Sequence, residues 1–172
     1  MGVGQAPIAG TGDGAPSLPQ MAIAQLKNHL KPLGFTKSRQ LWSRERGEAV
    51  QLIALQKDRE GRGFMVRAGC RFASLPEPDQ HGPMKTHVSF QLDILLRRLD
   101  APAYDVHVGD PGSEAADADT LRSRYAGKVD RLAELVDEHI LPMLDAMPDE
   151  AAARAMLGEA EGKSPLASSL DR

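Results

Sequence analysis

The stretch that decides the fold is residues 30–72, LKPLGFTKSRQLWSRERGEAVQLIALQKDREGRGFMVRAGCRF. Pro32 and Gly34 end a helix, because proline lacks a backbone N–H and glycine tolerates the left-handed cap conformation. Phe35 then begins extended chain. Two apolar segments follow, residues 48–56 and 62–72, separated by the charged run 57–61. They predict two antiparallel strands joined by a turn.

The apolar pattern of these segments predicts which faces are buried. Residues 49–56 are apolar on both faces, which is typical of a central strand that is covered, at least in part, on both sides. Residues 63–72 alternate, so one face packs against helices and the other is partly in water. The first face carries Phe64, Val66, Ala68, Cys70 and Phe72, and the second carries Met65, Arg67, Gly69 and Arg71.

Shorter elements flank these two strands. Residues 35–43 predict one short strand, and Arg44 to Gly47 predict a hairpin turn in which Gly47 takes a positive φ. Residues 86–92 alternate again, with Val88, Phe90 and Leu92 inward and His87, Ser89 and Gln91 outward. Residues 93–99 fit either a strand or a helix, and residues 104–108 predict a last short strand. Between strands, the proline-rich segment 73–85 is long enough to be a functional or mobile loop.

Helical periodicity appears at both ends of the chain. Ser17 can cap a first helix whose apolar stripe is Ile23, Leu26, Leu30 and Leu33. Residues 113–146 predict a long helix that Pro142 kinks or restarts, with a buried face of Leu121, Tyr125, Val129, Leu132, Val136, Ile140 and Met143. A short helix from residue 150 to Leu157 ends at Gly158.

This order of elements predicts an α+β fold: a single antiparallel sheet of about four to five strands packed against N- and C-terminal helices. We expect a flexible tail over residues 1–17, one domain over residues 18–158, and a frayed tail over residues 159–172.

Composition restricts the class of protein. The chain has 172 residues, enough for one domain with a core, and a single cysteine, which excludes an internal disulfide and indicates a reducing compartment. No signal peptide or spanning segment is evident, so we expect a cytoplasmic protein without membrane contact. Net charge is −3, but residues 21–72 hold 11 basic and 4 acidic residues, whereas residues 100–161 hold 5 and 15. This polarity can steer a partner, or the two halves attract each other within the fold.

The residues also resemble a known family. The run LKPLGFTK at residues 30–37, Trp42 followed by Arg44, VQLIALQK at residues 50–57 and GFMV at residues 63–66 are similar to those of the bacterial domain of unknown function 4304 (DUF4304). The resemblance covers residues 21–72 and continues weakly to a helix–proline ending at Pro142. It implies a fold but no catalytic residues, and it implies a likeness to small immunity proteins, which block bacterial toxins by binding them.

Catalytic and metal-binding chemistry finds little support. The five histidines lack the spacing and cysteine partners of a zinc site. His87 and His107 converge only if their strands pair suitably, which would make a ligand or acid–base pair. Cys70 lies on the apolar face, where a thiol is inert. We therefore predict a non-enzymatic protein without a cofactor.

Two charged surfaces are candidates for binding a partner. Asp130, Glu134, Asp137 and Glu138 lie on the solvent side of the long helix and match the charge of a basic toxin, although such charges are more often only solvated. The alternative face is basic, with Arg67 and Arg71 grouped with Arg44 and Lys57 and with Gln51 and Gln56 nearby. It would serve an acidic partner or a nucleic acid, but interleaved aromatics are missing, so nucleic acid is the less favoured partner. The sequence thus predicts an immunity protein that binds a cognate toxin or effector.

Overall fold

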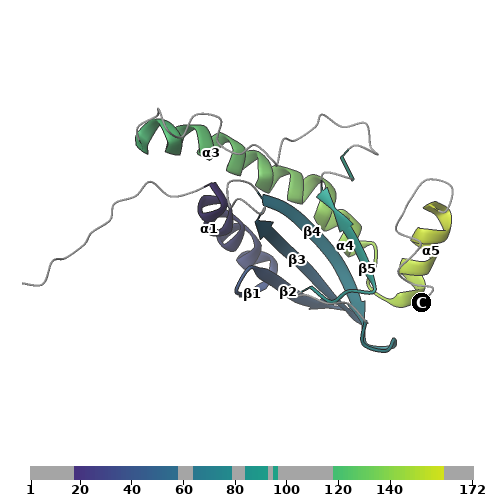
Figure 1. Ribbon diagram of the computed structural model, residues 1–172. Coiled ribbons are helices and arrows are strands. Elements are labelled where there is room, and N and C mark those ends of the chain that lie inside the picture. Colours follow the sequence, from purple (N-terminus) through teal and green to yellow (C-terminus); the bar gives the residue numbers. More distant parts are fainter. Residues whose placement is uncertain (1–17, 58–63, 79–83, 93–94, 97–117, 161–172) are drawn as a thin grey trace, which may run out of the picture.

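The chain folds into one antiparallel sheet with helices before and after it, as a computed structural model shows (Figure 1). The structure describes residues 18–57, 64–78, 84–92, 95–96 and 118–160. The helical elements are α1 (Leu18–Leu30), the 3₁₀ turn η1 (Lys31–Leu33), α3 (Ala118–Leu135), the π-helical turn η2 (Val136–Ile140), α4 (Leu141–Asp145) and α5 (Glu150–Ala160). The strands are β1 (Thr36–Ser38), β2 (Leu41–Arg46), β3 (Ala49–Lys57), β4 (Phe64–Phe72) and β5 (Val88–Gln91).

The sheet has the strand order β1-β2-β3-β4-β5, and every neighbouring pair is antiparallel. The predicted pairing of the two long strands is confirmed: Ala49 lies opposite Phe72 and Lys57 opposite Phe64. This arrangement confirms the predicted α+β class and its single antiparallel sheet.

The residues before β3 form two strands where the sequence predicted one. Arg39 takes a positive φ of 56°, which turns the chain between β1 and β2 and lets Thr36 pair with Ser43. The next turn is tighter than predicted, because β2 continues to Arg46 and only two residues separate it from β3. Gly47 has a φ of 62°, and a Cβ atom there would lie 2.6 Å from the Pro148 carbonyl oxygen. Glycine therefore serves both the turn and its contact with the chain before α5.

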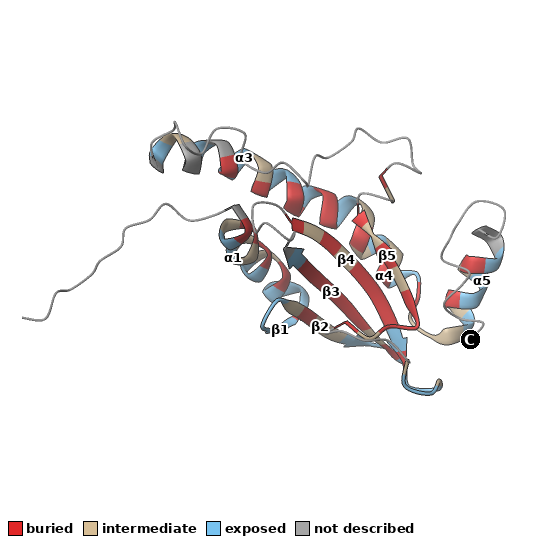
Figure 2. Cartoon of the chain, in the orientation of Figure 1, coloured by how far each residue is buried: buried red, intermediate tan, exposed pale blue. Residues whose placement is uncertain are grey.

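Buried residues fall on both faces of the sheet, as the pattern of β3 predicted. Figure 2 shows β3 buried over most of its length. The larger cluster joins one face to α1, α3, η2 and α4, and it includes Leu26, Ile53, Phe64 and Leu132. The opposite face, which we call the outer face, carries a small cluster of Leu52, Ala54 and Met84 with Leu41 and Val50 against it. Because β4 alternates, its cysteine and both its phenylalanines face the helices. Leu33, predicted in the apolar stripe of the first helix, is instead 38% exposed, and Ala22 is buried there.

The long C-terminal helix is confirmed from Ala118 onward and changes its hydrogen bonding before Pro142. The N–H of Leu141 bonds to the carbonyl oxygen of Val136, which is the five-residue spacing of a π turn. Proline cannot donate a helical hydrogen bond and its ring crowds the carbonyl one turn earlier, so the wider turn accommodates Pro142. The kink or restart that the sequence predicted thus takes the form of η2 followed by α4.

The last helix, α5, is longer than predicted, since it passes Gly158 and reaches Ala160. Asp149 accepts a hydrogen bond from the N–H of Ala152 at 2.7 Å, so it caps the helix. Leu157 and Ala153 belong to the main core. The sequence left open whether residues 93–99 are strand or helix; Leu95 and Leu96 are helical. The strand predicted over residues 104–108 and both predicted tails, apart from Glu159 and Ala160 in α5, lie outside the described residues.

Candidate functional site

The four predicted carboxylates lie on exposed positions of α3 and η2, the helical surface that faces away from the sheet. The side chains of Glu134, Asp137 and Glu138 are 64%, 52% and 58% exposed. On the other side of the same helix, Leu132, Val136 and Ile140 are fully buried. The 3.6-residue period places the acids and the core residues on opposite sides, so packing fixes which way the acids point. We call these four residues the acidic face.

Neighbouring side chains hold the acidic face in place. Asp137 lies 2.7 Å from Nε2 of His29, and Asp130 accepts a longer hydrogen bond, 3.4 Å, from Gln25, so both contact α1. Arg131 donates to Glu134 at 2.8 Å and lies 3.8 Å from Glu138. Each such surface pair contributes little stability, about 0.2–1 kcal/mol. Together they restrict the rotamers of the four carboxylates.

The predicted basic face does not exist as one surface. Trp42 on β2 pairs with Ile53 on β3, and this register puts Arg44 and Gln51 on the side of the sheet that faces the helices. Arg67 and Arg71 lie on the outer face, Arg67 partly buried and Arg71 exposed. Grouping Arg44 with them was therefore wrong, because side-chain direction along β2 depends on a register that the sequence did not show.

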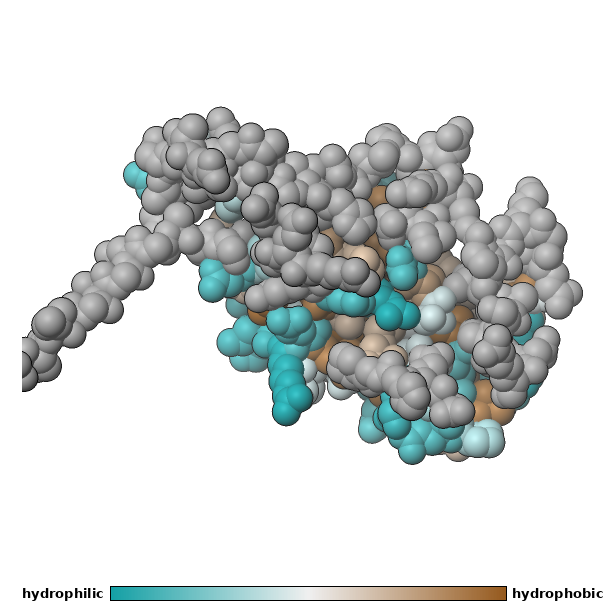
Figure 3. Space-filling view, in the orientation of Figure 1, coloured by the Kyte–Doolittle hydropathy of each residue, from teal (hydrophilic) through white to brown (hydrophobic). Residues whose placement is uncertain are grey.

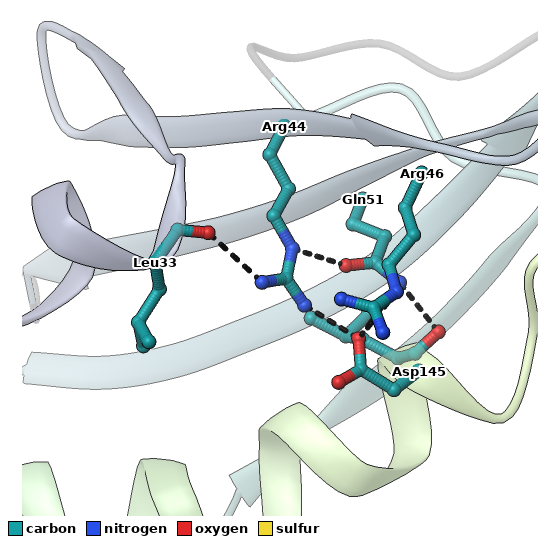
Figure 4. A network of polar contacts seen from close by, with 6 residues as sticks. Leu33, Arg44, Arg46, Gln51 and Asp145 are labelled. Atoms are coloured by element: carbon teal, nitrogen blue, oxygen red, sulfur yellow. Dashed lines mark hydrogen bonds and ion pairs between the residues drawn. The ribbon is translucent and has the colours of Figure 1, made fainter.

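Arg44 is instead the centre of a partly buried polar network that joins the sheet to the C-terminal helices (Figure 4). Its Nε donates to Gln51 at 2.7 Å, its Nη1 donates to the carbonyl oxygen of Leu33 at 3.0 Å, and its Nη2 pairs with Asp145 at 2.5 Å. Gln51, fully buried, donates to the carbonyl oxygen of Leu144 at 2.7 Å. The guanidinium also lies over the Phe35 ring, 4.5 Å from its centroid. Because each of these groups bonds to another group of the chain, we interpret the network as a structural one that holds the C-terminal helices to the sheet.

These contacts bear on the uneven charge of the sequence. Arg44 and Arg46 from the basic half both pair with Asp145 from the acidic half, and His29 pairs with Asp137. Some of the opposite charges of the two halves therefore attract each other within the fold, which is one of the two alternatives that the uneven charge left open. Asp145 was not singled out from the sequence, because an ion pair across 101 residues has no local signal.

His87 was predicted to point outward and is buried. The N–H of Phe72 donates to its Nδ1 at 2.9 Å, and its Nε2 lies 2.7 Å from the carbonyl oxygen of Pro76. An Nδ1 that accepts must be unprotonated, so Nε2 carries the hydrogen and donates to Pro76. Both ring nitrogens are bonded to backbone, and the ring stacks on Phe72 at 6.0 Å. This imidazole holds the chain after β4 against β5; His107, its proposed partner, lies outside the described residues.

Cys70 is buried, as predicted, and burial raises the pKa of its thiol to about 12, with Asp145 adding a smaller effect of the same sign. Because the thiolate is the reactive form, we expect native protein to resist alkylation by iodoacetamide at pH 8 and to react once it is unfolded in urea. Trapping by a thiol reagent should thus report unfolding. Rapid labelling of the native protein would show that β4 opens locally.

A thiol whose folded pKa exceeds its unfolded value binds its proton more tightly in the folded state, so its contribution to stability is complete below pH 9 and is lost as pH rises toward 12. We expect urea midpoints to fall across this range by a larger amount for the wild type than for a Cys70→Ala variant.

Two other features that could indicate a site or an anchor are absent from the described part of the chain. No three of its histidine, cysteine, aspartate and glutamate side chains are arranged to hold a metal ion. None of its helices has both the length and the apolar character needed to cross a bilayer.

Comparison with known proteins places the chain in a family. The family model described as Domain of unknown function (DUF4304) matches residues 26–146, well over half of the sequence. The chain belongs to the DUF4304 family. The match to DUF4304 runs from Leu26 in α1 to Ala146 at the end of α4, so it contains the whole sheet and the acidic face and leaves α5 outside. No curated protein and no solved structure matches the chain.

Proposed function

We propose that this DUF4304 protein is a non-enzymatic binding protein of the immunity type, a bacterial, cytoplasmic inhibitor that neutralises a basic toxin or effector by covering it. The observation that carries the proposal is the acidic face: four exposed carboxylates on one side of a helix whose other side is anchored in the core. A surface of one charge sign speeds association with an oppositely charged partner and discourages other partners.

The fixed geometry of the acidic face supports binding. Asp130 and Asp137 are bonded to α1, and Glu134 and Glu138 share Arg131. Side chains that are already ordered lose less conformational entropy when a partner binds. The sheet is a weaker candidate for nucleic acid, since its basic residues are divided between two faces.

The test begins with capture of a partner from cells of the source organism, with wild-type protein and a Glu134→Lys/Glu138→Lys variant compared side by side. We expect the captured protein to stop growth when expressed alone and to be neutralised by co-expression of the wild type. The variant should bind it with an association rate lower by about 10- to 100-fold at low salt, since the charges that steer the encounter are reversed.

A matched control separates local charge from net charge. Glu45→Lys/Glu48→Lys changes two exposed glutamates of the β2–β3 hairpin, so both double variants shift the net charge by four, from −3 to +1. The control variant should neutralise as well as the wild type. Equal rates for all three proteins would exclude the acidic face, and a captured partner without toxicity would refute the immunity function.

A further inference from the structure

The outer face of the sheet has a row of four residues that lie side by side across the strands. Leu41 pairs with Ala54, Ala54 with Arg67, and Arg67 with Gln91, so β2, β3, β4 and β5 each contribute one side chain. Figure 3 shows apolar surface over the sheet with hydrophilic groups beside it. A positive charge therefore stands next to the small apolar cluster of the outer face.

Arg67 is unusual among these side chains because its Nε is buried without a partner among the described residues. It is partly buried, its Nε is inaccessible to solvent, and that nitrogen has no hydrogen-bond acceptor. Within the described part of the chain no ion pair reaches its guanidinium, whereas Arg44 bonds a carboxylate, an amide and a backbone carbonyl. Keeping a guanidinium nitrogen out of water without an acceptor is unfavourable, because the hydrogen bond lost from water is not replaced.

The neighbours of Arg67 are suited to a polar ligand. Across the ladder it meets Ala54 and Gln91, and the diagonal positions on these two strands are Leu52, Gln56 and Ser89. The side-chain amides of Gln56 and Gln91 and the hydroxyl of Ser89 can donate hydrogen bonds. No carboxylate of β3, β4 or β5 is adjacent to Arg67 in this ladder. An added oxyanion would therefore meet donors and no negative charge from these strands.

We propose that Arg67, with Gln91 and Gln56, binds the oxyanion group of a ligand, a carboxylate or a phosphate, on the outer face of the sheet. The planar fork of a guanidinium matches both groups with paired hydrogen bonds. The ligand supplies the hydrogen-bond acceptors that the described residues do not provide to Arg67. This site is on the opposite side of the sheet from the helices that carry the acidic face, so the two proposals stand or fail separately.

The test uses the full-length protein labelled with ¹⁵N, because each arginine Nε–H gives its own resonance. The Arg67 resonance is assigned as the one that disappears in Arg67→Met. Phosphate and citrate are titrated separately against sodium chloride of equal ionic strength. We expect saturable movement of the Arg67 resonance, with binding at least tenfold weaker in Arg67→Met when followed by backbone amides of β4 and β5.

Arg71→Met is the matched control, since it removes an exposed arginine from the same strand and the same face, and it should bind as the wild type does. Saturation by phosphate alone or by citrate alone identifies the ligand group, and both outcomes support the site. Movement that never saturates, or that Arg71 shares equally, would show that the end of Arg67 is merely hydrated and would overturn the proposal. So would Arg67→Met protein that binds as tightly as the wild type.

Discussion

Replacing Gly69 by alanine is expected to lower the free energy of unfolding by about 3 kcal/mol or more, and to separate β5 from β4. A Cβ atom at this position would lie 2.1 Å from the carbonyl oxygen of Val88 and 3.0 Å from the Thr86 methyl carbon. The first contact is with backbone, which cannot rotate away as a side chain can. The strand must therefore move, and the hydrogen bond from the His87 N–H to the Cys70 carbonyl oxygen moves with it.

Urea unfolding of the Gly69→Ala variant measures the loss, and amide hydrogen exchange of β5 locates it. Gly127→Ala is the control, because Gly127 lies in α3 and an added Cβ there meets no atom within 4 Å. That substitution should raise stability by about 0.5–1 kcal/mol, the helix penalty of glycine. If both variants unfold at the wild-type midpoint, the close approach of β5 to Gly69 is not present in solution.

Replacing Gln51 by leucine is expected to cost about 2–3 kcal/mol, although leucine is the more apolar residue and the site is fully buried. The substitution removes the acceptor of the Arg44 Nε and the donor to the Leu144 carbonyl oxygen. Arg44 is only 10% exposed, so water cannot readily replace the lost acceptor. A buried donor left without an acceptor costs more than the bond itself contributed.

Gln56→Leu provides the control on the same strand, since Gln56 is exposed and should tolerate the change within about 0.5 kcal/mol. Differential scanning calorimetry or urea titration compares the two variants. An equal effect at both positions would mean that the Arg44 network contributes nothing to stability. A larger loss for Gln51→Leu together with weakened hydrogen-exchange protection of α4 would confirm that the network holds this helix to the sheet.

Local rules predicted most of the sheet. Alternation in residues 63–72 identified which side chains of β4 face the helices, and apolar residues on both faces of β3 indicated its central place. Gly34 and Gly47 were predicted to take positive φ and have values of 86° and 62°. Each of these features follows from residues close in sequence, whose backbone preferences and burial act within one element.

The wrong predictions concern side chains whose direction depends on residues far away in the sequence. Arg44 was placed in water and lies against α4, because the register of β2 on β3 decides its face. His87 was placed outward and bonds the backbone at Phe72 and Pro76, because the chain after β4 folds back over it. Such contacts join residues that are distant in the sequence, and no periodic pattern in the sequence indicates them.

The candidate surfaces divide in the same way. The exposed position of Asp130, Glu134, Asp137 and Glu138 was predictable from helical period, whereas their contacts with α1 and Arg131 were not. Arg67 was correctly placed on the partly wet face of β4, but its lack of an acceptor became visible only in three dimensions.

By itself, the sequence determined most of the element types, the turn glycines, the buried side of each long strand and the DUF4304 membership, since these depend on local conformation and on residue pattern. The tertiary structure alone decided which charged side chains pair within the fold and which remain exposed. Electrostatic and hydrogen-bond energies depend on distance and burial, and both are set by strand register and helix packing between residues as far apart as Arg44 and Asp145.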